Sequence, residues 1–173
     1  AAPAAFWATT IYNGPHIVGI LALQFPINQI NQLMTGSQDW QADGLGETGE
    51  TYLVGPDLTM RSVARGLLEA PDDYQEALQE AQIAQTVVNN VQQSNTTVLV
   101  QKIETPAAYA ALAGESGTMQ GENYLGTPVL SAYAPVALAG LNWGIITEMS
   151  QQEVNQPIAS LQQQMLMVWL IAV

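Results

Sequence analysis

The chain has 173 residues, of which 48% are hydrophobic, so it is long enough for one packed domain with flanking segments. It carries 15 acidic residues against 3 basic ones, and the formal net charge of -12 disfavours binding to nucleic acid or to anionic lipid. It contains no cysteine, which excludes disulfides and thiolate metal sites.

The first residues predict a β-hairpin followed by a helix. Apolar runs at 6–12 and 17–24 flank Asn13-Gly14, and Asn-Gly between such runs is a strong short-range hairpin signal. Pro26 suits the first turn of a helix, and apolar residues recur after it at helical spacing. Because a lone hairpin is marginal in water, we expect this hairpin to belong to a preceding module.

The next segment predicts a loop, two strands and a long helix. Residues 37–50 are polar and rich in glycine, which is typical of a loop. Short strands are expected at 51–54 and 58–62, on either side of a Gly-Pro-Asp turn. A long helix is expected over 71–93, because apolar residues there lie near one stripe.

The following part of the chain predicts a three-stranded meander. A strand or extended loop at 97–102 and a short helix at 106–113 precede it. Strands are expected at 117–124, 127–134 and 142–149, and consecutive strands joined by short turns pair antiparallel. The whole pattern predicts an α+β fold, with helices flanking an antiparallel sheet.

The C-terminal segment predicts a helix that enters a membrane. Ser150 and Glu153 have the spacing of a capping box, in which each side chain bonds the other residue's backbone N–H. Residues 165–173 are apolar and uncharged, and a spanning helix needs roughly 20 such residues. The alternative is an apolar helix that packs on the core. No lysine or arginine follows Lys102, so we expect the segment before the apolar run to be extracytoplasmic.

Several stretches, taken in order, resemble one known family. They are GLGETGETYLVGPD at 44–57, MRS at 60–62, GESG at 114–117, GTPVLSAYAP at 126–135 and GLNW at 140–143. Together they resemble the membrane-proximal module of the Cache (PAS-like) sensor domains of bacterial receptors. Residues 11–14 and 17–24 are similar to the last two strands of the membrane-distal module of the same domains.

The resemblance implies an extracytoplasmic sensor between two membrane helices, feeding a cytoplasmic cyclase, histidine kinase or chemoreceptor output, usually as a homodimer. It divides the chain into the end of a distal module with a linker helix at 1–35, a PAS-like proximal module at 36–150, and a juxtamembrane helix with the start of a membrane helix at 151–173. Family members that sense amino acids carry an aspartate near the end of the last distal strand. Gln24 stands near that position and supplies no carboxylate, which disfavours amino-acid sensing.

The candidate ligand site consists of Tyr52, Arg61, Tyr124 and Tyr133. A guanidinium in a domain so poor in cations could clamp a carboxylate through two hydrogen bonds, with tyrosine hydroxyls fixing the orientation. The alternative is structural: Arg61 pairs with Glu50 or Asp57, and the tyrosines belong to the core.

The remaining motifs do not predict chemistry. The G-x-G-x-x-G pattern at 44–49 lacks the preceding strand and following helix of a dinucleotide site. His16 is the only histidine, and Asp39 and Asp43 form either a weak cation site or an ordinary loop. We therefore expect no catalytic, cofactor or metal site, and no enzyme. The chain is expected to sense a small molecule; the alternative is a spacer or dimerisation module without a ligand.

Overall fold

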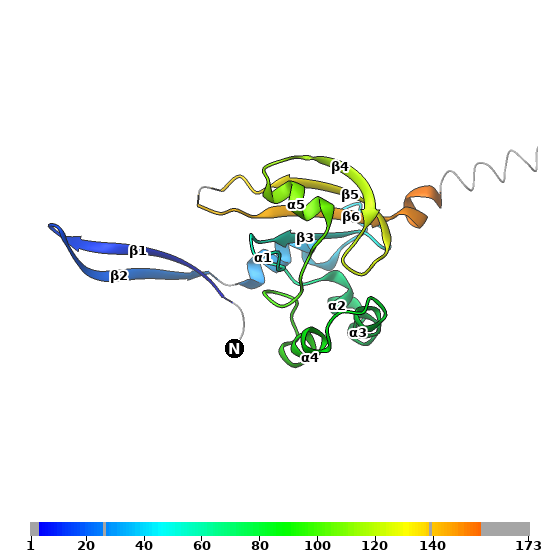
Figure 1. Ribbon diagram of the computed structural model, residues 1–173, viewed down its shortest axis with the longest axis horizontal. Coiled ribbons are helices and arrows are strands. Elements are labelled where there is room, and N and C mark those ends of the chain that lie inside the picture. Colours follow the sequence, from blue (N-terminus) through cyan, green and yellow to red (C-terminus); the bar gives the residue numbers. More distant parts are fainter. Residues whose placement is uncertain (1–3, 26, 139, 157–173) are drawn as a thin grey trace, which may run out of the picture.

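An antiparallel four-stranded sheet forms the centre of the fold. The computed structural model describes residues 4–25, 27–138 and 140–156. The strands lie in the order β3 (Glu50–Val54), β6 (Gly144–Ser150), β5 (Pro128–Pro135) and β4 (Gly117–Glu122) (Figure 1). The expected α+β fold and the C-terminal meander are thus confirmed.

The register of the sheet decides which side chains meet on its helix-facing side. Along β6 the residues Gly144, Ile146 and Glu148 are buried, and those between them are only half-buried. Successive strand residues point to opposite faces, so these three share the inner face. On β3, Glu50 lies directly opposite Glu148 in the antiparallel ladder. Two carboxylates are therefore placed side by side on the buried face.

Four helices cover this face: α2 (Arg65–Glu69), α3 (Pro71–Glu80), α4 (Gln85–Ser94) and α5 (Pro106–Leu112). In Figure 1, α2, α3 and α4 gather below β3, and α5 lies against β5 and β6. The approach of α5 depends on Gly144, because a Cβ there would lie 2.7 Å from Ala111 Cβ. Leu78, Val88 and Ile146 are among the fully or almost fully buried side chains that fill the core.

Three expected elements differ from the structure. Residues 58–62 contribute only isolated bridges at Thr59 and Met60, because the chain turns through Leu58 with a positive φ of 62°. The expected helix over 71–93 is divided into α3 and α4 by Gln82, whose φ is 55°. Of the two alternatives for 97–102, the strand does not form: residues 98–100 make a turn, and Lys102 makes only an isolated bridge with Thr59. The helix α2 appears where no helix was expected.

The N-terminal hairpin extends away from the sheet in Figure 1. It consists of β1 (Ala5–Asn13) and β2 (His16–Phe25), as expected, and α1 (Ile27–Met34) follows it. Phe6 and Trp7, which are consecutive residues of β1, point to opposite faces of the hairpin, and both are exposed, by 61% and 62%. Apolar residues exposed on both faces of a two-stranded hairpin call for a further packing surface.

The described part of the chain ends in a helical segment at 151–156, directly after β6. The apolar run at 165–173, on which the membrane prediction depends, lies outside the described residues. Within the ranges that are described, no helix has the length and apolar character needed to cross a bilayer.

Candidate functional site

Two buried glutamates, Glu50 and Glu148, form the chemical centre of the domain. They are 9% and 4% exposed and lie opposite each other on β3 and β6. Glu50 accepts hydrogen bonds from the Arg65 backbone N–H (2.7 Å) and the Tyr124 hydroxyl (3.0 Å). Glu148 accepts one from the Tyr52 hydroxyl (3.0 Å). Like charges directly opposite each other destabilise a sheet, so this pair requires compensation.

Burial raises the pKa of both carboxyl groups. The pKa of Glu148 rises to about 7, because burial disfavours its charge and the neighbouring charge of Glu50 adds to the effect. Burial also raises the pKa of Glu50, against the lowering effect of its bonds to Arg65 and Tyr124. The charge of Glu148 therefore changes near neutral pH and depends on what lies beside it.

A cavity of about 290 Å³ opens beside the pair, between the sheet, α2, the start of α3 and the β4–β5 turn. Its lining includes Glu50, Glu148, Tyr74 and Tyr124. Two buried atoms of this lining, the Tyr74 hydroxyl oxygen and Glu148 Oε1, make no hydrogen bond of normal geometry within the described part of the chain, although Tyr124 lies beside the first side chain and Asn123 beside the second. Burial and the charge of Glu50 raise the pKa of Tyr74, so its hydroxyl stays a neutral donor. Buried polar groups normally have partners, so these two atoms make this cavity the candidate ligand site.

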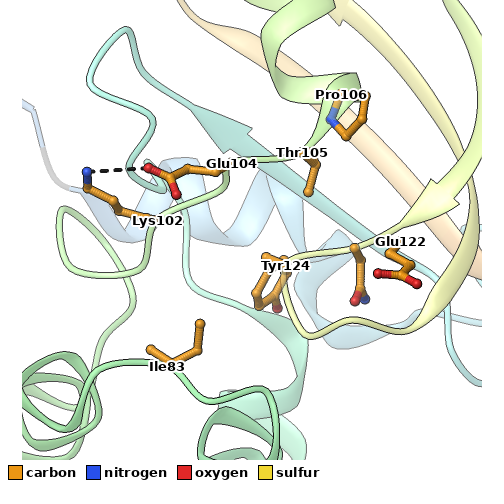
Figure 2. A pocket seen from close by; sticks show the side chains of 8 residues that line it. Ile83, Lys102, Glu104, Thr105, Pro106, Glu122 and Tyr124 are labelled. Atoms are coloured by element: carbon orange, nitrogen blue, oxygen red, sulfur yellow. Dashed lines mark ion pairs between the residues drawn. The ribbon is translucent and has the colours of Figure 1, made fainter.

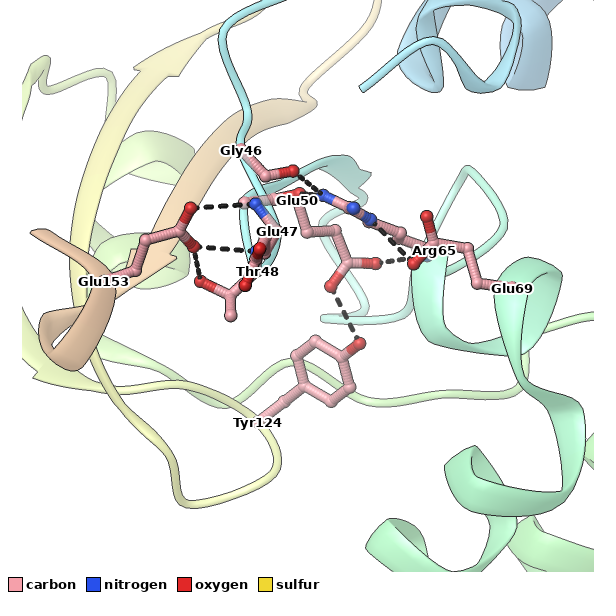
Figure 3. A network of polar contacts seen from close by, with 9 residues as sticks. Gly46, Glu47, Thr48, Glu50, Arg65, Glu69, Tyr124 and Glu153 are labelled. Carbon is pink, nitrogen blue, oxygen red and sulfur yellow. Dashed lines mark hydrogen bonds and ion pairs between the residues drawn. The ribbon is translucent and has the colours of Figure 1, made fainter. Parts of the chain in front are cut away.

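Arg65 fixes the position of α2 above the cavity. Its guanidinium donates to the carbonyls of Gly46 (3.2 Å) and Gly49 (2.6 Å) and pairs with Glu69 at 3.0 Å (Figure 3). Its Cζ also lies 4.7 Å from the centroid of the Trp40 ring. The positive charge of Arg65 is thus committed to the 46–49 loop and to α2.

The same loop holds the start of the C-terminal helix. The backbone N–H groups of Glu47 and Thr48 each donate to the Glu153 carboxylate at 2.8 Å (Figure 3). Hydrogen bonds from the Thr48 side chain and from these N–H groups lower the pKa of Glu153. Gly46 has a φ of 56°, and a Cβ there would lie 2.1 Å from Glu153 Oε1. The loop thus forms a cradle that a side chain at 46 would fill.

The expected capping box is realised on one side only. The Ser150 hydroxyl accepts from the Glu153 backbone N–H at 3.2 Å. The Ser150 backbone N–H donates to the Thr48 hydroxyl (3.1 Å) in place of the Glu153 side chain, which reaches the loop. A hydrogen bond between residues more than 100 positions apart has replaced the local capping bond. The start of the C-terminal helix is therefore held against the 46–49 loop.

The structure brings two of the four candidate ligand residues together. The rings of Tyr52 and Tyr124 meet edge to face with centroids 5.8 Å apart, and Tyr124 lines the cavity. Tyr133 lies on the same sheet face, paired with Ile146 on β6. Arg61 is paired with Asp57 at 2.7 Å, which is the structural alternative stated above.

Sequence reasoning missed Glu148 and Arg65, although a signal for the first was available. Position 148 continues the buried phase of the β6 alternation set by 144 and 146, so an acid there is expected to face the core. A buried acid in a strand needs a partner, which is a functional signal. Arg65 gave no comparable signal, because α2 itself was not expected.

A second, larger cavity of about 450 Å³ also has Tyr124 in its lining (Figure 2). Its lining includes Lys102 and Glu104, whose ion pair of 3.6 Å joins side chains that are 61% and 58% exposed. Exposed pairs of this kind contribute little energy. The smaller cavity, with its buried titratable groups, is therefore the stronger candidate for a functional site.

Comparison with solved structures identifies the fold. The chain is similar to the periplasmic sensory domain of the Campylobacter jejuni chemoreceptor Tlp1, with a TM-score of 0.57, 13% identity, and coverage of 89% of this chain and 45% of that one. The chain thus spans less than half the length of that structure. At this identity the similarity shows the fold alone, and the resemblance to Cache sensor domains is confirmed at that level.

Weaker similarities follow. The ligand-binding domain of the Pseudomonas aeruginosa amino acid chemoreceptor PctB, solved with L-arginine, gives a TM-score of 0.47 at 16% identity, covering 93% of this chain and 49% of that one. The ligand-binding domain of the Pseudomonas fluorescens chemoreceptor CtaA, solved with L-leucine, gives a TM-score of 0.46 at 11% identity, covering 88% of this chain and 49% of that one. No protein-family model matches the sequence. No curated protein matches it either.

Proposed function

We propose that this chain is an extracytoplasmic ligand-sensing part of a bacterial transmembrane receptor. The ligand binds in the cavity beside Glu50 and Glu148, and the helix that follows Ser150 carries the resulting change towards a cytoplasmic output. The fold shared with a periplasmic sensory domain supports this proposal. The observation that carries it is a continuous set of hydrogen bonds from the cavity to the C-terminal helix.

Each step of this set joins neighbouring groups. Glu50 in the cavity accepts from the backbone N–H of Arg65, at the start of α2. The Arg65 guanidinium holds the carbonyls of Gly46 and Gly49. The N–H groups between those two glycines hold Glu153. A ligand that displaces α2 relative to the sheet would therefore move the loop and the C-terminal helix together (Figure 3).

The proposal includes the domain division and the membrane. Residues 1–35 would complete a distal module, and the apolar faces of the hairpin support a packing partner there. Residues 36–150 would form the sensing module, and 151–173 would lead into the bilayer, as the uncharged run at 165–173 suggests. Two copies side by side would let a shift of one C-terminal helix act against the other.

A spacer or dimerisation module without a ligand is the second candidate. One observation favours it: the pKa of Glu148, at about 7, allows a proton to relieve the charge of the glutamate pair. In that case the pair needs no ligand, and the cavity has no occupant that shifts the helix.

A distance measurement separates the two candidates. The chain lacks cysteine, so the exposed positions Ala132 on β5 and Gln152 on the C-terminal helix can carry spin labels through Ala132→Cys and Gln152→Cys. A thermal-shift screen first identifies compounds that raise the Tm, since a ligand that prefers the native state must do so. A sensor shows a changed label-to-label distance with such a compound, and Glu153→Ala, which removes every acceptor for the 46–49 loop, abolishes the change while leaving binding intact. A spacer yields no compound that changes the distance.

A further inference from the structure

We infer that the cavity binds a small organic cation, an amine or a quaternary ammonium group, between the carboxylates of Glu50 and Glu148 and beside the rings of Tyr74 and Tyr124. The inference rests on the proposed function, because it names the class of ligand for the same site. A site for such a cation must meet three requirements. It must carry negative charge that lacks a positive partner, offer an acceptor to the ligand's N–H donors, and present aromatic surface.

The first requirement is met by the charge of the glutamate pair. Ion pairs in the described part of the chain join Arg61 to Asp57, Arg65 to Glu69 and Lys102 to Glu104, and none reaches Glu50 or Glu148. The nearest cation, Arg65, spends its donors on two loop carbonyls and Glu69. A buried carboxylate needs a positive partner or a proton, and a cationic ligand supplies the partner.

The second and third requirements are met by the cavity wall. Glu148 Oε1 is a buried acceptor that makes no hydrogen bond of normal geometry in the residues that the structure describes, although Asn123 lies beside this carboxylate, and Glu148 lines the cavity. A protonated amine donates up to three hydrogen bonds and fits such an acceptor. Tyr74 and Tyr124 line the same space, and aromatic rings attract ammonium groups through cation–π interactions. At about 290 Å³ the cavity suits a small molecule.

Other ligand classes fit less well. Magnesium and calcium ions take six or more oxygen ligands, and no group of three or more metal-ligating side chains suited to an ion occurs among the described residues. An anionic ligand would meet two carboxylates in a chain whose net charge is -12. A neutral ligand would leave the charge of the glutamate pair to be relieved by a proton alone, whereas a cation compensates the ionised pair directly.

The test uses the full 173-residue chain at about pH 7, where Glu148 is partly protonated, with calorimetry and thermal shift. The probes are methylamine, propylamine and choline, with propan-1-ol and propionate as uncharged and anionic counterparts and magnesium chloride as a metal control. We expect at least one of the three cations to bind saturably and to raise the Tm. Binding should release protons, seen as a dependence of the heat on the buffer, because the cation favours the ionised pair.

Variants locate the binding. Glu148→Gln and Glu50→Gln should weaken the affinity for that cation at least about tenfold, since hydrogen bonds to charged groups are among the strong ones. Glu148→Gln keeps a side-chain oxygen for the Tyr52 hydroxyl. Glu50→Gln keeps an oxygen for the Arg65 backbone N–H, and its amide group can donate to the Tyr124 hydroxyl, so circular dichroism should show an intact fold for both. Glu115→Gln removes one exposed charge that is not part of the cavity lining and should leave the affinity unchanged.

Three results would overturn the inference: none of the three cations binds, propan-1-ol or propionate binds as tightly, or magnesium alone binds with the same loss in Glu148→Gln. The outcome for the proposed function is read separately. If a cation binds but the distance between labels at Ala132 and Gln152 stays constant, the cation site stands and the sensor function fails. If another compound changes that distance and the cations do not bind, the sensor function stands and the cation inference falls.

Discussion

Replacing Glu148 by glutamine should remove a pH dependence of stability that the wild-type domain carries. The folded-state pKa of Glu148 is about 7, compared with an ordinary value of 4.5, because the group is buried and faces Glu50. The folded state therefore binds the proton more tightly than the unfolded state does. The stability contributed by this proton is complete below about pH 4.5, and it is lost as the pH rises to about 7.

The magnitude follows from the size of the pKa shift. Each pKa unit corresponds to about 1.4 kcal/mol, so between about pH 5 and pH 8 the free energy of unfolding should fall by roughly 2–3 kcal/mol from this group alone. The side chain is 4% exposed, so solvent screening reduces this little. Glu148→Gln is neutral at every pH and also removes the repulsion on Glu50. Relative to wild type, the variant should gain those roughly 2–3 kcal/mol over the same range.

Urea denaturation at several pH values, followed by tryptophan fluorescence, measures this difference. Urea keeps the ionic strength constant, and the difference between wild type and variant cancels the general effect of a net charge of -12. Glu115→Gln, an exposed charge-matched control, should follow wild type within about 0.5 kcal/mol. A constant difference between wild type and Glu148→Gln across the range would refute the reasoning on the buried pair.

Three further predictions concern packing and the loop. Gly46→Ala should lower the free energy of unfolding by at least about 1 kcal/mol, because φ is positive and the Cβ meets the Glu153 carboxylate; urea denaturation checks it, and a stabilised variant would contradict it. Gly144→Ala should cost about 1–3 kcal/mol through overpacking against Ala111, and an unchanged Tm would exclude that contact. Leu78→Ala should lower the free energy of unfolding by about 2–5 kcal/mol, because the side chain is fully buried. Leu99→Ala, at a half-exposed site, is the control and should be near neutral; equal losses in the two variants would contradict the core assignment.

Local signals made much of the fold predictable. The Asn13-Gly14 hairpin and the three-stranded meander follow from turn residues and alternation, which act over a few residues. The break between α3 and α4 did not follow, because Gln82 adopts a left-handed conformation that its residue type does not favour. Tertiary packing decides that break: Leu78 before it and Val88 after it both reach the core.

The site was less predictable, because its contacts join residues far apart in the chain. Glu50 meets Glu148 only through the pairing of β3 with the last strand, which local patterns do not specify. The contact of Glu153 with the 46–49 loop displaces a local capping interaction that the sequence favoured. Residue type alone could not show which arginine, Arg61 or Arg65, belongs to the site. Their partners distinguish them: Arg61 pairs with Asp57 at a surface turn, whereas Arg65 lines the cavity and binds the carbonyl of Gly49.

The distance between spin labels at Ala132 and Gln152 tests the central claim most directly. It should be measured by pulsed electron paramagnetic resonance on the full chain, with and without a saturating compound that raises the Tm and depends on Glu148. We predict a shifted distance distribution with the compound, and no shift when Glu153→Ala releases the helix from the 46–49 loop. A compound bound at the glutamate pair that leaves the distribution unchanged would contradict a sensing role for this cavity.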